Sequence, residues 1–266
     1  MSDACPLVLL PGWSLPAALF DSLRRALPAG WHVQVLPEAL AASASDGLLA
    51  GMASAALAQA PPRAIWCGHS LGGLVALQAA LQAPERVAGL LLLAATPSFV
   101  RRDGWASAMP AGELAAFAAG LDADLAGTLA RFDALQCRGG EHARADLRTL
   151  RAWRADAADN APSPARAAAL RRGLQALAAA DLRTAAARVQ CPQTWLLGEC
   201  DALVPAAAAR EIRLLSPSAR VVTCAAANHL LGLAGDARDV RDALAGLRAS
   251  CLPASGTASA PLTESR

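Results

Sequence analysis

The chain contains no lysine and no tyrosine, so arginine supplies all 24 of its basic side chains. Its formal net charge of +2 gives no overall case for binding nucleic acid or a membrane surface. No two of its seven cysteines have C-x-x-C spacing, so neither a zinc site nor a disulfide framework is indicated. The sequence also has no apolar run near the ~18 residues that span a bilayer, and no signal-peptide pattern at its start. We therefore expect a cytoplasmic protein that contacts neither membranes nor nucleic acid.

What the sequence does have is a large apolar content, because hydrophobic residues make up 55% of it and charged residues 17%. Short apolar runs alternate with helical patterns over much of its length. The expected strands cover residues 7–10, 32–36, 64–67, 87–93, 194–197 and 220–224. The expected helices between and after them cover residues 16–27, 46–59, 71–82, 206–215 and 236–247. This alternation predicts an α/β fold with a mostly parallel central sheet flanked by helices.

One long segment breaks the alternation. Residues 98–189 are rich in Ala and Arg, have helical patterns and show no convincing strand. We interpret this segment as a helical cap inserted between two halves of the core, residues 1–97 and 190–251. Residues 252–266 are rich in Pro, Ser, Ala and Thr, so we expect a disordered tail. Nothing in the sequence indicates an oligomer, and a monomer is the default expectation.

The most informative motif is Gly68-His69-Ser70-Leu71-Gly72, which follows a predicted strand and opens a predicted helix. That setting is typical of a nucleophile elbow, in which a serine sits on a sharp strand-to-helix turn. Gly68 and Gly72 would remove Cβ atoms that collide where strand and helix nearly touch. The alternative is a glycine turn with an N-capping serine. We favour the first interpretation, in which Ser70 is a nucleophile.

A serine nucleophile needs a base and an acid that orients the base. Of the four histidines, only His229 falls in the loop after the last predicted strand. Asp201 follows the preceding strand, at the sheet edge where catalytic residues of α/β folds gather. Taken alone, Asp201 is typical of a turn and His229 of a polar loop. The order Ser70, Asp201, His229 instead predicts a catalytic triad.

Ester hydrolysis by such a triad also requires donors for the oxyanion. The Leu71 N–H follows the nucleophile directly and is one expected donor. The second is expected from the loop after the first strand, where we choose the Trp13 N–H beside Gly12. The alternative makes Trp13 only an aromatic that faces the cap. This chemistry requires no metal and no organic cofactor.

With these residues placed, the chain resembles the α/β-hydrolase superfamily over nearly its whole length. Within it, the sequence is most similar to the family of pimeloyl-[acyl-carrier protein] methyl ester esterases of biotin synthesis. The resemblance rests on residues 7–13 (LVLLPGW), the elbow with Gly72-Gly73, and the cap stretch 131–136 (RFDALQ). It departs at Pro11, where the family usually has a histidine that braces the oxyanion loop.

The resemblance implies a serine carboxylesterase that removes the methyl ester from a pimeloyl chain held by acyl-carrier protein. It makes Ser70, Asp201 and His229 catalytic. The residues that it places in the substrate site are Trp13, Ser70, Leu71, Phe132, Asp133, Ala134, Leu135, Gln136 and His229.

The cap supplies a separate argument for the carrier. Arg144, Arg148 and Arg151 recur at i, i+4 and i+7, and Arg154 follows one turn later, on a stripe that we expect to face solvent. Acyl-carrier proteins are acidic, and guanidinium groups suit phosphate and carboxylate recognition. The family's carrier-binding arginines map best onto Arg131, Arg144 and Arg148. The alternative is a charged helix face that is merely solvated.

Other functions share this machinery. A generalist carboxylesterase or thioesterase would use the same triad on short acyl esters. An acyltransferase would pass the acyl group to an alcohol instead of water. A catalytically silent α/β-hydrolase that only binds ligands is disfavoured by the intact triad, and a dehalogenase is disfavoured because its nucleophile would be Asp.

Overall fold

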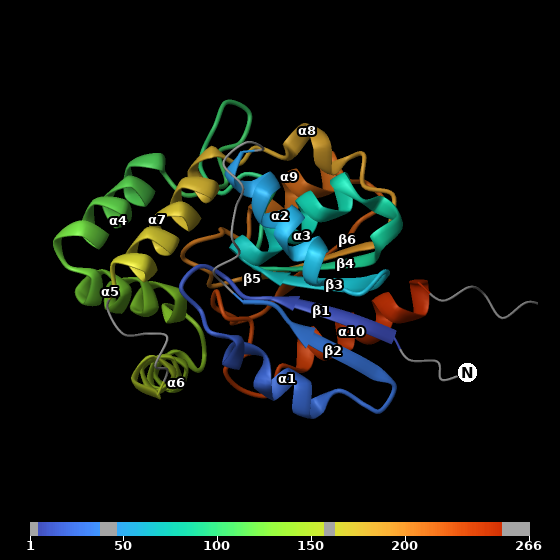
Figure 1. The fold of residues 1–266 in the computed structure, drawn as a ribbon, viewed down its shortest axis with the longest axis horizontal. Helices are drawn as coiled ribbons and strands as arrows, with labels where there is room; N and C mark the ends of the chain where they lie inside the picture. The colour runs from blue at the N-terminus through green and yellow to red at the C-terminus, as the bar shows by residue number, and fades with distance from the viewer. Residues whose placement is uncertain (1–4, 38–46, 157–162, 252–266) are drawn as a thin grey trace, which may run out of the picture.

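The computed structural model describes residues 5–37, 47–156 and 163–251. Within these ranges, parallel strands form one six-stranded sheet in the order β2-β1-β3-β4-β5-β6 (Figure 1). Their bounds are β1 Cys5–Leu10, β2 Trp31–Val35, β3 Ala64–His69, β4 Val87–Leu93, β5 Gln193–Gly198 and β6 Arg220–Cys224. The predicted α/β fold with a parallel central sheet is confirmed.

Both faces of the sheet are buried, as the continuous apolar strands predict. In β1, Leu7 and Leu9 pack into one hydrophobic cluster, while Val8 and Leu10 pack into the cluster on the opposite face. The first face is covered by the 3-10 helix η1 (Ala17–Phe20), α1 (Asp21–Ala26) and α10 (Arg238–Cys251). The opposite face is covered by α2 (Leu48–Gln59), α3 (Leu71–Gln82) and α9 (Ala208–Leu215) (Figure 1).

The predicted elements agree with the structure except at their ends and in two short 3-10 helices. Residues 16–27 form η1 followed by α1 instead of one continuous helix, and a short 3-10 helix η2 (Pro84–Arg86) precedes β4. Such end differences are expected, because hydrophobic spacing locates an element better than its boundaries. The predicted tail at residues 252–266 lies outside the described residues.

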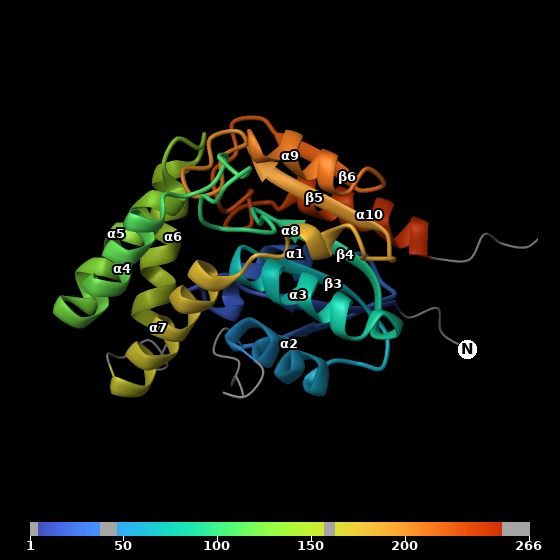
Figure 2. The ribbon, with the colours of Figure 1, turned by 90° about the horizontal axis from the view of Figure 1, so that it is seen from above.

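Between β4 and β5 the chain forms five helices within the described ranges. They are α4 (Ala111–Ala123), α5 (Leu125–Cys137), α6 (Ala143–Asp156), α7 (Pro164–Ala179) and the short α8 (Arg183–Ala186). Asp124 caps α5 by accepting from the Gly127 N–H, and Ser163 caps α7, which starts with Pro164. In Figures 1 and 2, α4 to α7 lie together beyond the end of the sheet at which β1 and β3 finish. These helices therefore face the sheet edge where the predicted catalytic residues lie.

Candidate active site

Ser70 stands at the turn between β3 and α3, with φ 52° and ψ −116°. This strained conformation is found mostly where structure around a residue enforces it, and it is common at active sites. A Cβ atom on Gly68 would lie 2.2 Å from the Gly72 carbonyl oxygen, and one on Gly72 would lie 2.3 Å from the Leu10 carbonyl oxygen. Both glycines are therefore required by close backbone contact, as predicted, and the turn presents Ser70 at the strand's carboxyl end.

The structure brings Asp201 and His229 together. The His229 Nδ1 lies 2.7 Å from Asp201 Oδ2, and both side chains are fully buried. The other carboxylate oxygen, Asp201 Oδ1, accepts from the Leu203 N–H at 2.8 Å and the Val204 N–H at 2.9 Å. With both oxygens engaged, the acid is fixed in orientation. Because a carboxylate oxygen accepts, the Nδ1 of His229 carries the proton and its Nε2 keeps a lone pair.

This Nε2 is the clearest sign of a base. It is buried, and no group of the described residues forms a hydrogen bond with it. Because Asp201 already holds the other ring nitrogen, this unpaired Nε2 is the position at which His229 can accept a proton. A serine hydroxyl or a water could donate to it during a reaction.

His69 links the serine turn to the loop that carries His229. The His69 Nε2–H donates to the His229 carbonyl oxygen at 2.8 Å, and the two imidazole centroids are 4.9 Å apart. Burial, reinforced by the neighbouring His229, lowers the pKa of His69 from 6.5 to about 3. His69 is therefore neutral at physiological pH, and its hydrogen bond holds the base loop beside Ser70.

The loop after β1 also touches the elbow. A Cβ on Gly12 would lie 2.5 Å from His69 Nδ1 and 3.1 Å from Ser70 Cβ, so Gly12 is required by this close approach. Among the residues that the structure describes, neither the Trp13 N–H nor the Leu71 N–H donates to a protein acceptor. Two unpaired N–H groups beside a serine suit the stabilisation of an oxyanion.

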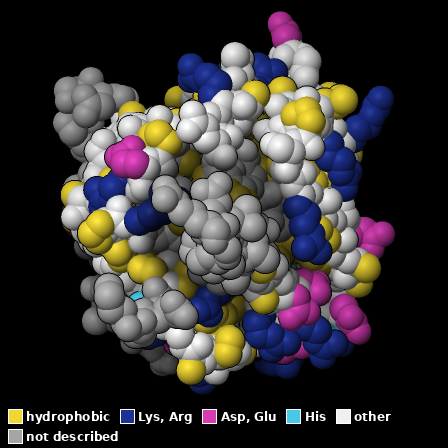
Figure 3. Space-filling model, turned by 90° about the vertical axis from the view of Figure 1, so that its right-hand side faces the viewer, with side chains coloured by type: hydrophobic (Ala, Val, Ile, Leu, Met, Phe, Trp, Pro, Cys, Tyr) yellow, Lys and Arg dark blue, Asp and Glu magenta, His cyan; other side chains and the backbone are white. Residues whose placement is uncertain are grey.

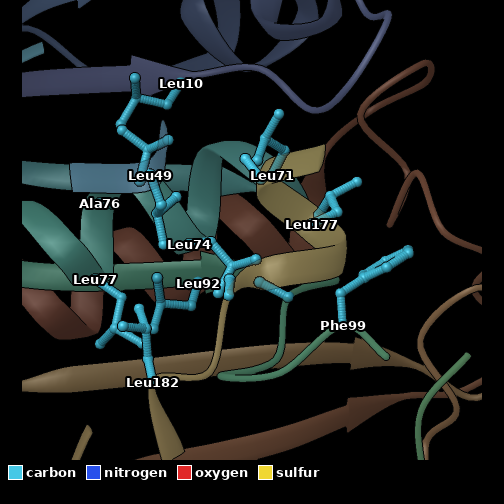
Figure 4. Close-up of a cluster of buried hydrophobic side chains, with 14 of the residues drawn as sticks. Leu10, Leu49, Leu71, Leu74, Ala76, Leu77, Leu92, Phe99, Leu177 and Leu182 are labelled. Atoms are coloured by element: carbon cyan, nitrogen blue, oxygen red, sulfur yellow. The ribbon is translucent and has the colours of Figure 1, made fainter. Parts of the chain in front are cut away.

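The Trp13 side chain joins this loop to the helices α4 to α7, which we call the cap. Its Nε1–H donates to the Leu170 carbonyl oxygen of α7 at 2.8 Å, and its ring meets Phe132 of α5 edge to face at 4.6 Å. Leu71, next to the nucleophile, lies in the same cluster of apolar side chains as Leu177 of α7 (Figure 4). The cap is thus packed directly on both segments that supply the N–H groups.

The cap residues that the resemblance assigns to the substrate site differ in burial. Phe132 and Gln136 are buried, and Leu135 is partly buried. Asp133 is also buried, but Arg154 pairs with its carboxylate. Ala134 is exposed, so its side chain lies on the opposite side of α5 from its buried neighbours.

The arginines of the cap differ in whether they face solvent. Arg144, Arg148 and Arg151 are exposed on α6, as predicted. Arg131 is exposed on α5 and donates to the Thr128 hydroxyl at 2.8 Å. The prediction was wrong for Arg154, which turns inward to Asp133 and Ser14. At 100° per residue, Arg154 lies about 20° from Leu147 and about 40° from Leu150 around the helix, on the apolar side.

The sequence did not predict a contact between the cap and the base loop. Asn228, next to His229, donates through Nδ2 to Asp146 Oδ2 of α6 at 2.7 Å and to the Cys137 carbonyl oxygen at 3.2 Å. Burial raises the pKa of Asp146 despite this hydrogen bond. The only signal in the sequence was an Asn adjacent to the proposed base, which does not identify a partner.

Within the described residues, no cluster of His, Cys, Asp or Glu side chains is arranged to hold a metal ion. Likewise, none of the helices in those residues has the length and apolarity needed to cross a membrane.

A model of the alpha/beta hydrolase family matches residues 7–243. A pimeloyl-[acyl-carrier protein] methyl ester esterase of Xanthomonas axonopodis pv. citri (strain 306) is 39% identical over 90% of this chain and 92% of its own. One of the same name from Klebsiella pneumoniae is 42% identical over 76% and 77%.

Among solved structures, an esterase from Exiguobacterium antarcticum shares the fold with a TM-score of 0.76 at 20% identity, covering 93% of each chain. The family match covers most of the residues described above, including the serine turn, Asp201 and His229. The chain belongs to the alpha/beta hydrolase family.

Proposed function

We propose that this chain is a serine carboxylesterase that hydrolyses the methyl ester of a pimeloyl group held on acyl-carrier protein, a step of biotin synthesis. The observation that carries this proposal is the 39% identity, over 90% of the chain, to a relative with that name. The buried Asp201–His229 pair, and the strained Ser70 that His69 links to the His229 loop, support ester hydrolysis independently.

In the proposed mechanism, the Ser70 Oγ attacks the ester carbonyl carbon while His229 Nε2 takes the hydroxyl proton. Asp201 holds the imidazole and stabilises its charged form. The Trp13 and Leu71 N–H groups stabilise the oxyanion. When the tetrahedral intermediate collapses, the C–O bond to the methoxy group breaks, and His229 returns its proton to release methanol.

Water then attacks the acyl-enzyme, again with His229 as the base. The bond to Ser70 breaks and the serine regains its proton. The product is a pimeloyl carrier with a free carboxylate. The flanking contacts of Trp13 with Phe132 and Leu170 keep the cap over this centre, which excludes bulk water from the intermediate.

The carrier would dock on the arginines of the cap. Arg144, Arg148 and Arg151 are exposed on α6, and Arg131 is exposed on the adjacent α5. An acidic carrier protein would meet these guanidinium groups on the same cap whose Phe132 contacts Trp13 of the oxyanion loop. This placement would bring the carried acyl chain to Ser70 from the cap side.

The test compares hydrolysis of the carrier-bound pimeloyl methyl ester with that of a short p-nitrophenyl ester. Efficient cleavage of the carrier ester is expected. In Ser70→Ala, both rates should fall by about 10³-fold or more, because the nucleophile is lost while the rest of the site remains. Cleavage of the short ester alone would contradict the proposed substrate and leave a generalist esterase.

A further inference from the structure

An ion pair inside the cap reaches the loop that carries Trp13. Asp133 of α5 is 1% exposed, and it accepts hydrogen bonds from both the Nε and an Nη of Arg154 of α6. Figures 1 and 2 show α6 next to α5. Two parallel bonds between a guanidinium and a carboxylate fix both side chains in orientation.

The guanidinium has donors left over, and these go to the core. Arg154 Nη1 donates to the Ser14 carbonyl oxygen at 3.3 Å, and Nη2 donates to the Ser14 hydroxyl at 3.1 Å. Ser14 has φ 65°, a left-handed backbone conformation that is unfavourable for residues other than glycine. It closes the turn in which the Leu15 N–H donates to the Gly12 carbonyl oxygen. Arg154 therefore holds a strained residue directly after Trp13.

Helix α5, which carries Asp133, also contacts the loop of the base. Gln136, one turn after Asp133, donates to the Asp133 carboxylate at 3.4 Å. The backbone carbonyl oxygen of Gln136 accepts from the backbone N–H of His229 at 3.1 Å. Asp133 is thus the common partner of Arg154, which binds the oxyanion loop, and of Gln136, which binds the base loop.

We propose that the Arg154–Asp133 pair is a positioning device that fixes the oxyanion loop relative to His229, so that the cap sets the alignment of the catalytic centre. Neither residue touches the reacting atoms. Their effect passes through Ser14 to the Trp13 N–H and through Gln136 to the His229 backbone. This inference rests on the proposed function only in taking Ser70 as the nucleophile, and it does not depend on the substrate.

The test measures the rate at which a fluorophosphonate labels Ser70, because its phosphoryl oxygen needs the same donors as an ester oxyanion and no carrier is involved. The main variant is Asp133→Leu with Arg154→Met. It removes both charges and fills the site with apolar side chains, so it leaves no unpaired charge in the cap. The matched control is Asp122→Leu with Arg171→Met, which removes an exposed ion pair between α4 and α7.

We expect the main variant to keep the thermal stability of the wild type but to be labelled about tenfold more slowly, since small misplacements of catalytic groups lower rates strongly. With the short p-nitrophenyl ester, kcat should fall while KM changes little. The control should match the wild type in both assays. Labelling of Asp133→Leu with Arg154→Met at the wild-type rate would overturn the proposal and give the pair a role in packing only.

Arg154→Lys provides a second measure if the double variant does not fold. An ammonium keeps the charge beside Asp133, but it lacks the fork that reaches Asp133 and Ser14 together, so slower labelling is again expected. Labelling of Arg154→Lys at the wild-type rate would also overturn the inference. Failure of the proposed function looks different, because the wild type would then be labelled rapidly yet leave the carrier ester intact. A wild type that is not labelled at all would overturn both.

Discussion

His69 precedes the nucleophile, and its buried imidazole joins the serine turn to the loop of the base. Its Nε2–H donates to the His229 carbonyl oxygen, while its Nδ1 is buried without a partner in the described part of the chain. Burial favours the neutral form and brings its pKa to about 3. A proton taken up by His69 would have to enter this closed environment next to His229.

The folded state should therefore lose stability in mild acid. Because the pKa of His69 is lowered from 6.5, the unfolded chain binds a proton below pH 6.5 that the folded protein does not. The stability from this residue is complete above pH 6.5 and declines as the pH falls towards 3. Between pH 7 and pH 5 the loss is about 2 kcal/mol. Urea unfolding at both pH values measures it.

His69→Gln is the matched variant, since an amide can still donate to the His229 carbonyl but does not titrate. The free energy of unfolding of this variant should fall by about 2 kcal/mol less than that of the wild type between pH 7 and pH 5. Equal losses in the two proteins would mean that another group causes the acid sensitivity.

For single residues, the sequence predicted which residues form the site better than it predicted where their side chains point. Ser70, Asp201 and His229 follow from a motif and from the order of loops along the chain. The contact of His69 with His229 does not, because the direction of a side chain at a strained turn depends on what packs around it. The hydrogen bonds of Arg154 to Ser14 join residues 140 positions apart, a separation over which local spacing carries no information.

Among the elements, α6 combines two roles on different sides. Its exposed side carries Arg144, Arg148 and Arg151, while Asp146 and Leu150 are buried. Arg154 belongs to the buried side through its position around the helix. The spacing of three and four residues groups all four arginines in the sequence, although the last one lies beside the apolar stripe.

If the exposed arginines dock the carrier, reversing their charge should affect only carrier-bound substrates. We expect Arg144→Glu with Arg148→Glu to raise KM for the carrier-bound methyl ester by about tenfold, because two attractive contacts become repulsive. The kinetic constants for the short p-nitrophenyl ester should not change. Steady-state kinetics on both esters measure the difference.

A control of equal charge change is available on the core. Arg210 of α9 and Arg220 of β6 are exposed and lie outside the cap. Arg210→Glu with Arg220→Glu should leave KM for the carrier ester close to that of the wild type. A similar rise of KM in both double variants would show that overall charge is responsible and that α6 has no special part in docking.

For the whole molecule, the layered core could be predicted and the docking of the cap could not. Strand–helix alternation determines a parallel sheet with buried faces, because apolar strands and amphipathic helices have few ways to cover one another. The cap helices are rich in alanine and arginine, and many packings would bury their apolar sides equally well. Specific contacts select one, among them the Trp13 indole with the Leu170 carbonyl and Asn228 with Asp146.

Charge at this scale is nearly balanced. The net charge is +2, and on the face in Figure 3 basic and acidic side chains are interspersed with apolar ones. A balanced molecule exerts little long-range attraction on an acidic partner. In the proposed function, binding of the carrier then depends on the local group of arginines on the cap, whose reach is limited by ionic screening.

Salt should therefore affect the hydrolysis of the two esters differently. Between about 0.02 M and 0.3 M sodium chloride, kcat/KM for the carrier ester should fall about fivefold, since screening weakens the contacts with α6. The value for the short ester should stay constant, because Asp201, His229 and the N–H donors are buried from mobile ions. In Arg144→Glu with Arg148→Glu the salt dependence should flatten or reverse. If both esters lose activity equally with salt, the ions act on the catalytic centre or on the stability of the fold, and the electrostatic docking of a carrier is wrong.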